Sequence, residues 1–132
     1  MIRVLVCDDH QIVRQGIRQI LADAGDTTPG GGPASPIDVV GEAANGAEAL
    51  ARVRGGGIDV VLLDIAMPQR DGLDVLKALK AEWPKLPVLM LSTYPDRQYA
   101  VRSLKMGAAG YLNKSADSEQ MVDAVRRVAQ GK

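Results

Sequence analysis

The segment IDVVLLDIAMP, residues 58–68, sets the architecture of the chain. Its first six residues are apolar except for Asp59, and the apolar run stops at the carboxylate of Asp64. An aliphatic run of this length is typical of a strand that is covered on both faces, the central strand of a parallel sheet. Because Pro68 and Asp71-Gly72 punctuate the following residues as turns, we expect Asp64 to lie where the strand ends. Ligands of open α/β sheets bind at that edge, so Asp64 is the predicted chemical centre.

Strand and helix patterns alternate along the rest of the chain. Apolar runs predict strands at residues 1–7, 37–43, 58–63, 87–91 and 108–112. Apolar residues at helical spacing, with capping and breaking residues at their ends, predict helices from His10 to before Gly25, at 45–54 with Asn45 as the cap, from Leu73 to before Pro84, at 96–106, and after an Asp117-x-x-Gln120 pattern. Such alternation predicts an α/β fold, with a parallel sheet between two layers of helices and right-handed crossovers.

The side chains expected to anchor these helices are unequal in number. The first helix carries an apolar stripe of Ile12, Val13, Ile17, Ile20 and Leu21, and the last a stripe of Met121, Val122, Val125, Val128 and Ala129. In the fourth helix, only Val101 and Leu104 are large and aliphatic, and we expect them to be its anchors. Thr27–Pro36 holds six proline and glycine residues and is expected to be a mobile loop away from Asp64.

Composition limits the classes of function. The 132 residues, 46% of them hydrophobic, suffice for one domain with a single core, and we assign 1–132 to it. Sixteen basic and sixteen acidic residues cancel without a basic stripe, which argues against nucleic-acid or membrane binding by this chain. The single cysteine, Cys7, lies in an apolar run and is expected to be a buried structural thiol. No signal peptide or membrane-spanning run is evident, so a cytoplasmic location is expected.

Polar residues follow the predicted strands at their carboxyl ends. They are Asp8 and Asp9, Asp64, Ser92 and Thr93, and Lys114. Because parallel strands end at one edge of the sheet, these side chains should converge there. Three crowded carboxylates repel one another unless a cation binds, and Mg²⁺ is the ion that suits a few carboxylates with water and phosphoryl oxygens.

The loops around these acids exclude two common alternatives. A nucleotide or flavin fold binds phosphate on a glycine- or hydroxyl-rich first loop, whereas Asp8-Asp9-His10 would repel it without a metal. Asp64 is followed by Ile65-Ala66, which lacks the second acid expected of aspartate-nucleophile phosphatases. A carboxylate nucleophile with Mg²⁺, a lysine and a hydroxyl suits phosphoryl transfer to Asp64. His10 beside the acids is interpreted as a helix-start residue and as weak evidence for a transition-metal site.

Five motifs resemble those of response-regulator receiver domains, in particular the NarL/LuxR-type subfamily. They are VCDDH at 6–10, VGEAANG at 40–46, LDIAMP at 63–68 with the following Asp71-Gly72, LSTY at 91–94 and KMGAAGYLNK at 105–114. They cover almost the whole chain in the order and spacing of that family. The resemblance implies a flavodoxin-like, doubly wound five-stranded parallel sheet of order 2-1-3-4-5 with five helices.

The resemblance also implies a role for each matching residue. Asp64 would be the phosphoacceptor, Asp9 would bind Mg²⁺ directly and Asp8 through water, and the backbone carbonyl of Ala66 would complete the metal site. Ser92 and Lys114 would hold the phosphoryl oxygens. Tyr111 would act with Ser92 as a switch that changes the surface of the fourth helix, fifth strand and fifth helix. The phosphoryl donor would be a sensor histidine kinase.

Other functions remain open from the sequence. A receiver of this kind modifies itself at Asp64 and is not expected to turn over an external substrate. The DNA-binding domain usual in the subfamily is absent from residues 1–132, so DNA would be reached only through a further C-terminal domain; a homodimer is a further option. A degenerate, phosphorylation-independent interaction module and a metal-dependent hydrolase are the alternatives, and the full set Asp8, Asp9, Asp64, Ser92 and Lys114 argues against the first.

Overall fold

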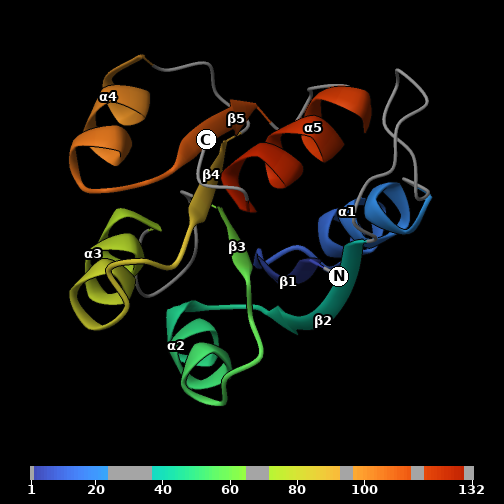
Figure 1. Ribbon diagram of the computed structural model, residues 1–132, viewed down its shortest axis with the longest axis horizontal. Coiled ribbons are helices and arrows are strands. Elements are labelled where there is room, and N and C mark those ends of the chain that lie inside the picture. Colours follow the sequence, from blue (N-terminus) through green and yellow to red (C-terminus); the bar gives the residue numbers. More distant parts are fainter. Residues whose placement is uncertain (1, 24–36, 65–71, 93–96, 114–117, 130–132) are drawn as a thin grey trace.

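A computed structural model describes residues 2–23, 37–64, 72–92, 97–113 and 118–129. Within them, five parallel strands form one sheet in the order β2-β1-β3-β4-β5, and five helices alternate with the strands (Figure 1). The strands are β1 (Ile2–Cys7), β2 (Ile37–Ala43), β3 (Val60–Asp64), β4 (Val88–Ser92) and β5 (Gly110–Asn113). The helices are α1 (Gln11–Ala22), α2 (Gly46–Arg54), α3 (Gly72–Glu82), α4 (Arg97–Lys105) and α5 (Ser118–Ala129). The predicted fold class and strand order are confirmed.

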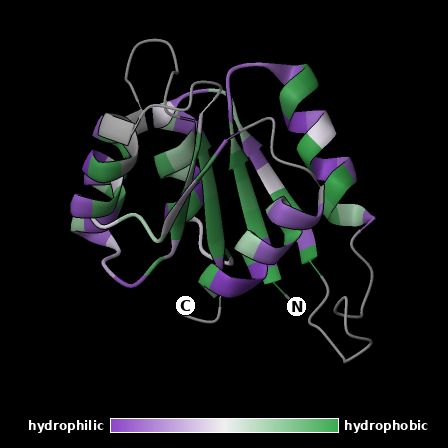
Figure 2. Cartoon of the chain, turned by 90° about the horizontal axis from the view of Figure 1, so that it is seen from above, coloured by the Kyte–Doolittle hydropathy of each residue, from purple (hydrophilic) through white to green (hydrophobic). Residues whose placement is uncertain are grey.

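The sheet separates two hydrophobic layers. Helices α1 and α5 cover one face, and α2 and α3 pack on the other, where α4 lies beside β5 (Figure 1). Side chains alternate between the faces of a strand, so Leu5 and Cys7 join the α2 and α3 layer while Val4 and Val6 join the α1 and α5 layer. Because both faces are covered, the inner strands are apolar along most of their length, and Figure 2 shows them as hydrophobic bands.

The element boundaries differ from the predicted ones by a few residues. The fifth strand runs from Gly110 to Asn113 rather than over 108–112, because the amide of Ala108 bonds back to the carbonyl of Ser103 and closes the turn after α4. That turn includes Gly107 at φ 103°, a conformation that favours glycine. Gly72, predicted as part of a turn, is instead the first residue of α3, and the central strand starts at Val60.

Two expectations about helix anchors are wrong. Val101 and Leu104 of α4 are 50% and 52% exposed, whereas Ser103 on the same helix is fully buried. In α1, Ile17 and Leu21 are buried but Ile12 is 83% exposed. Helical spacing reveals that a stripe exists, but it does not fix how the helix is rotated against the sheet when polar residues can also be buried with partners.

The ends of α2 follow the predicted capping. The side chain of Asn45 accepts a hydrogen bond from the amide of Glu48 at 2.9 Å, so the predicted N-cap is confirmed. Gly56 and Gly57 follow the helix with φ of 79° and 78°, where glycine meets no steric penalty. The expected loop Thr27–Pro36 and the Asp117 cap of the last helix lie outside the described residues.

Asp59, the one charged residue in the apolar run 58–63, links the amino ends of β1 and β3. Its carboxylate accepts hydrogen bonds from the Arg3 side chain at 3.0 and 3.1 Å and from the Arg3 amide at 2.8 Å. The hydrogen bond with Arg3 is the main cause that lowers the pKa of Asp59. The pair lies at the amino ends of β1 and β3, opposite to the edge that carries the site residues.

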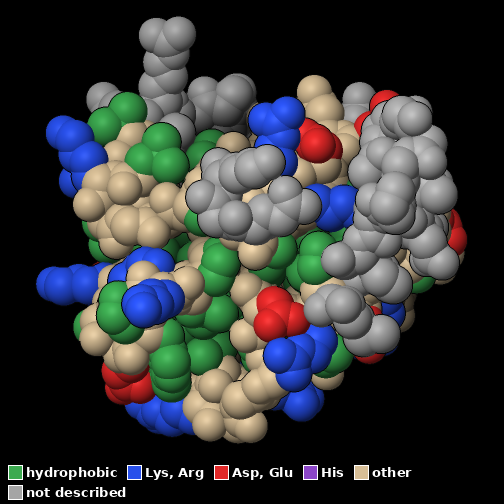
Figure 3. Space-filling view, viewed as in Figure 1, with side chains coloured by type: hydrophobic (Ala, Val, Ile, Leu, Met, Phe, Trp, Pro, Cys, Tyr) green, Lys and Arg blue, Asp and Glu red, His purple; other side chains and the backbone are tan. Residues whose placement is uncertain are grey.

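Charges on the surface are mixed in sign. The face shown in Figure 3 carries both Lys or Arg and Asp or Glu side chains, and hydrophobic side chains are visible over α4. Among the described residues, no helix combines the length and apolar character needed to cross a membrane.

Candidate functional site

The carboxyl edge of the sheet collects buried polar side chains. Asp8 directly follows β1, Asp64 ends β3 and Ser92 ends β4, and they are 0%, 2% and 2% exposed. The register fixes this proximity, because Cys7 pairs with Leu63 and Asp64 pairs with Leu91. Parallel strands in register therefore bring residues from three distant parts of the chain to one place, as predicted.

The acids of this edge form a tight group with His10. One ligand-capable atom from each of Asp8, Asp9, His10 and Asp64 lies within 4.8 Å of the others. Asp8 and Asp64 are buried, and the Asp9 side chain beside them is 27% exposed. Carboxylates crowded together away from water repel one another unless a cation binds them. The donor set, carboxylate oxygens in a small group, fits Mg²⁺.

Arg14 of α1 holds the backbone of this group in place. Its guanidinium donates to the carbonyl of Asp8 at 2.6 Å and to Oε1 of Glu42 at 3.0 Å. Glu42, in β2, is also bound by Arg18 through its second carboxylate oxygen at 3.0 Å. Because only 15% of the Arg14 side chain is exposed, these contacts link α1, β2 and the end of β1 with little competition from water.

His10 does more than begin a helix. It occupies the N-cap position of α1, as expected, but its side chain makes no capping hydrogen bond. Its Nδ1 lies 3.0 Å from Oδ1 of Asp9 and 3.3 Å from Oδ1 of Asp8, and its amide donates to the same Asp8 oxygen at 2.8 Å. The side chain of His10 therefore belongs to the acidic group, which the sequence pattern indicated only through adjacency.

Comparison with known proteins shows which family the chain belongs to. A family model described as the response regulator receiver domain matches residues 4–126. The chain belongs to this family. Response regulator UvrY from Escherichia coli (strain K12) is 37% identical over 131 residues, which cover 99% of this chain and 56% of that protein. The signal receiver domain of the response regulator NarL from Mycobacterium tuberculosis matches with a TM-score of 0.85 and 34% identity, over 99% of this chain and 98% of that one.

A further structural match comes from a complex. A chain of the CheX-CheY complex with BeF3 and Mg²⁺ from Borrelia burgdorferi has a TM-score of 0.83 and 26% identity, over 96% of this chain and 88% of that one. This receiver domain spans about half the length of the curated relatives it matches. Receiver domains of two-component response regulators act as phosphorylation switches, and relatives such as DegU of Brevibacillus brevis are transcriptional regulatory proteins.

Several predicted site residues of this receiver domain lie outside the described residues. They are Ala66, Thr93 and Lys114, and their roles stay predictions. Tyr111 is described: it is half-buried in β5, opposite Met90 of β4, and packs against the hydrophobic layer shared with α2 and α3. This position neither requires nor contradicts a switch role.

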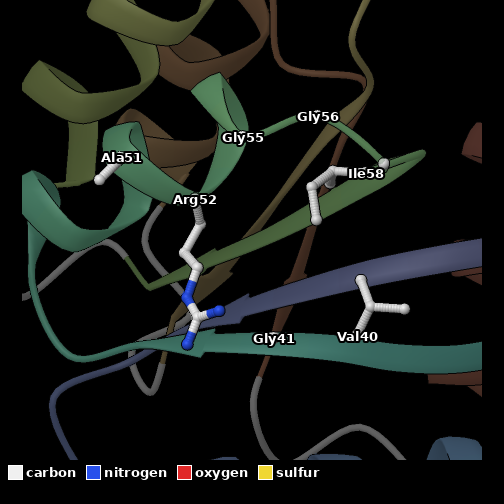
Figure 4. A pocket seen from close by; sticks show the side chains of 8 residues that line it. Val40, Gly41, Ala51, Arg52, Gly55, Gly56 and Ile58 are labelled. Carbon is white, nitrogen blue, oxygen red and sulfur yellow. The ribbon is translucent and has the colours of Figure 1, made fainter.

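A pocket of the receiver domain lies elsewhere. It has a volume of about 390 Å³ and lies between α2, the outer strand β2 and the glycine turn before β3 (Figure 4). Arg52 reaches from α2 toward Gly41 of β2 and is the one ionisable residue in the lining. Since none of the acids of the site lines it, this pocket is not the substrate cavity that a metal-dependent hydrolase would need beside Asp64.

Proposed function

We propose that this receiver domain accepts one phosphoryl group on Asp64 from a sensor histidine kinase, in a step that depends on Mg²⁺, and thereby controls an output such as transcription. The observation that carries the proposal is the convergence of the carboxylates of Asp8, Asp9 and Asp64 at the carboxyl edge of the sheet, with Asp8 and Asp64 buried. It is supported by the similar chain from Borrelia burgdorferi, whose complex contains Mg²⁺.

The carboxylate of Asp64 is the nucleophile in this proposal. One of its oxygens forms a bond to phosphorus while the bond between phosphorus and the donor's imidazole nitrogen breaks, and the nitrogen keeps the electron pair. Asp8, Asp9 and Asp64, with the carbonyl of Ala66, would hold Mg²⁺, which neutralises charge on the phosphoryl oxygens when it is bound. Burial of Asp64 among covered strands excludes most water, so electrostatic contacts with the transferred group are strong.

Ser92 and Lys114 would bind the oxygens of the transferred group. Ser92 ends β4 and pairs in register with Asn113, the last residue of β5, which Lys114 follows in the sequence. Drawing Ser92 toward the phosphoryl group would shift the loop after β4, and Tyr111 in the adjacent strand would report that shift to the surface of α4, β5 and α5.

The output domain and the cellular location of the protein are also part of the proposal. Relatives about twice as long suggest that the output, including DNA binding, resides in a C-terminal domain beyond the receiver, with homodimerisation as an option. Control of transcription requires access to the chromosome, so a cytoplasmic location follows. The receiver modifies itself once per signal and is not proposed to turn over an external substrate.

Phosphorylation by a small donor tests the proposal. Incubation with acetyl phosphate and Mg²⁺ should add the mass of one phosphoryl group per chain, and a chelator or Asp64→Asn should prevent it. Asp59→Asn is the matched control, since this aspartate lies at the amino end of β3 and should keep the label. A complete absence of label would support the interaction module instead, and release of many phosphates per chain would support the hydrolase.

A further inference from the structure

The position of His10 raises a question about the ion that this site selects. The imidazole is 67% exposed on the solvent side of the acids, yet its Nδ1 faces the oxygens of Asp9 and Asp8. It does not cap α1, although it stands at the N-cap position. The ring is therefore held against the carboxylates and not against the helix that it begins.

The separations around Nδ1 match those between ligands of one metal ion. With metal–ligand bonds of about 2.0–2.2 Å, neighbouring ligands lie about 3.0 Å apart in an octahedron and about 3.4 Å apart in a tetrahedron. Nδ1 lies 3.0 Å from Oδ1 of Asp9 and 3.3 Å from Oδ1 of Asp8. An ion could thus contact the nitrogen and both carboxylates with only a small adjustment of the ring, and an oxygen of Asp64 is within the same 4.8 Å group.

We infer that His10 supplies a nitrogen ligand at this acidic site, so that the site binds first-row divalent ions of the Zn²⁺ class in competition with Mg²⁺. This inference rests on the proposed metal site and extends it to a second class of ion. Mg²⁺ takes oxygen ligands, whereas imidazole suits Zn²⁺ and its neighbours in the series. A nitrogen added to three carboxylates therefore changes the selectivity of the site more than its strength for Mg²⁺.

The composition of the chain makes the inference sharply testable. His10 is the only histidine in the sequence, so any imidazole nitrogen on a bound ion must be its own. The single cysteine, Cys7, is fully buried in the core and offers no competing exposed thiol. The plain alternative is a hydrogen bond or ion pair between the ring and the acids, which would leave ion selectivity to the carboxylates alone.

Calorimetric titrations with Zn²⁺ and with Mg²⁺ decide between the two. They require protein without a histidine tag, and all variants are titrated in one buffer at one fixed pH. The ratio of Zn²⁺ to Mg²⁺ affinity should fall about tenfold or more in His10→Asn, as expected when a ligand is lost. It should not change in Gln11→Ala, an exposed neighbour at the start of α1. Asp9→Asn should weaken binding of both ions.

The nitrogen resonances of the single imidazole give an independent result. Saturation with Zn²⁺ should shift the ¹⁵N signal of Nδ1, and saturation with Mg²⁺ should leave it nearly unchanged. An unchanged affinity ratio in His10→Asn, or a Zn²⁺ shift confined to Nε2, would overturn the inference. If Mg²⁺ failed to bind the parent protein at all, the proposed phosphorylation switch would fail; normal Mg²⁺ binding with Zn²⁺ binding that ignores His10 would remove only this inference.

Discussion

Cys7 lies directly before the acids of the site, and its thiol is fully buried. Burial is the main cause that raises the pKa of this thiol, and the carboxylates of Asp8 and Glu48 act in the same direction. The unfolded chain would lose the thiol proton near pH ~8.5, while the folded chain keeps it. Stability that depends on the protonated thiol is therefore fully present below about pH 8.5 and decreases as the pH rises above it.

The expected loss is measurable. Between pH ~7.5 and pH ~9.5 the free energy of unfolding should decrease by about 1 kcal/mol more in the parent than in Cys7→Ala. Urea unfolding at the two pH values, without metal ions, measures both losses, and the comparison removes contributions from other groups. Equal losses in the two proteins would show that Cys7 ionises normally in the folded state.

Arg14 should affect metal binding although it touches no metal ligand side chain. Arg14→Met removes the hydrogen bond to the Asp8 carbonyl and the pairing with Glu42, so the acids should be held less precisely. We expect Mg²⁺ affinity to fall by about tenfold, the low end for residues that support ligands from behind. Arg18→Met is the control, because Arg18 binds Glu42 but makes no contact with Asp8. If both variants bind Mg²⁺ equally, Arg14 serves only as an ion-pair partner of Glu42.

At this scale, the sequence predicted the members of the site better than their contacts. Asp8, Asp9, Asp64 and Ser92 were identified because strand ends in a parallel sheet share one edge, a consequence of topology. The contacts of His10 and Arg14 could not be predicted in this way. They depend on side-chain rotamers and on a partner, Glu42, that is 28 residues away from Arg14.

Among the elements, α4 differs most from its predicted packing. The expected anchors Val101 and Leu104 are about half exposed, and among the α4 side chains that the structure describes, from 101 to 105, the buried one is Ser103. Elements with few buried apolar contacts tend to open at low cost in free energy. This fits the proposed role of α4 as part of the surface that reports phosphorylation.

Substitutions can distinguish the half-exposed positions of α4 from a fully buried position of α3. Val101→Ser combined with Leu104→Gln should change the free energy of unfolding by no more than about 0.5 kcal/mol per site, as is usual for surface changes. Leu79→Ala in the fully buried face of α3 should cost about 2–5 kcal/mol. Chemical denaturation of the unphosphorylated protein measures both. A loss in the α4 variant close to that of Leu79→Ala would restore these residues as anchors.

The extent of each element was predictable only within a few residues. Both faces of β1 and β3 are covered by core residues, so their continuous apolar runs could be recognised as strands. Asn45 correctly marked the start of α2. The start of β5 was misplaced, because Ala108 and Ala109 are apolar yet belong to the turn that Gly107 closes. Which apolar residues complete a turn depends on tertiary hydrogen bonds, here from Ala109 to the carbonyl of Val88.

For the whole molecule, the acidic site sets a balance between stability and ion binding. Asp8 and Asp64 are buried, and Asp9 lies beside them, so without a cation their charges repel one another. The folded state carries this cost and would recover it on binding the proposed Mg²⁺, because a ligand of the native state adds stability of RT ln(1 + [L]/Kd). Function and metal-free stability are therefore in opposition at this edge of the sheet.

Asp9→Asn should change this balance in both directions. Removing one charge from the group should raise the melting temperature of the metal-free protein, because the repulsion between the remaining carboxylates is smaller. The same change should remove most of the gain from Mg²⁺, which for the parent is about 1.4 kcal/mol at a concentration ten times Kd. Thermal melts of the two proteins with a chelator and with increasing Mg²⁺ measure both effects, and Asp38→Asn, in β2 away from the site, should behave like the parent. A variant that melts lower than the parent without metal, yet gains as much from Mg²⁺, would show that Asp9 supports the fold and does not bind the ion.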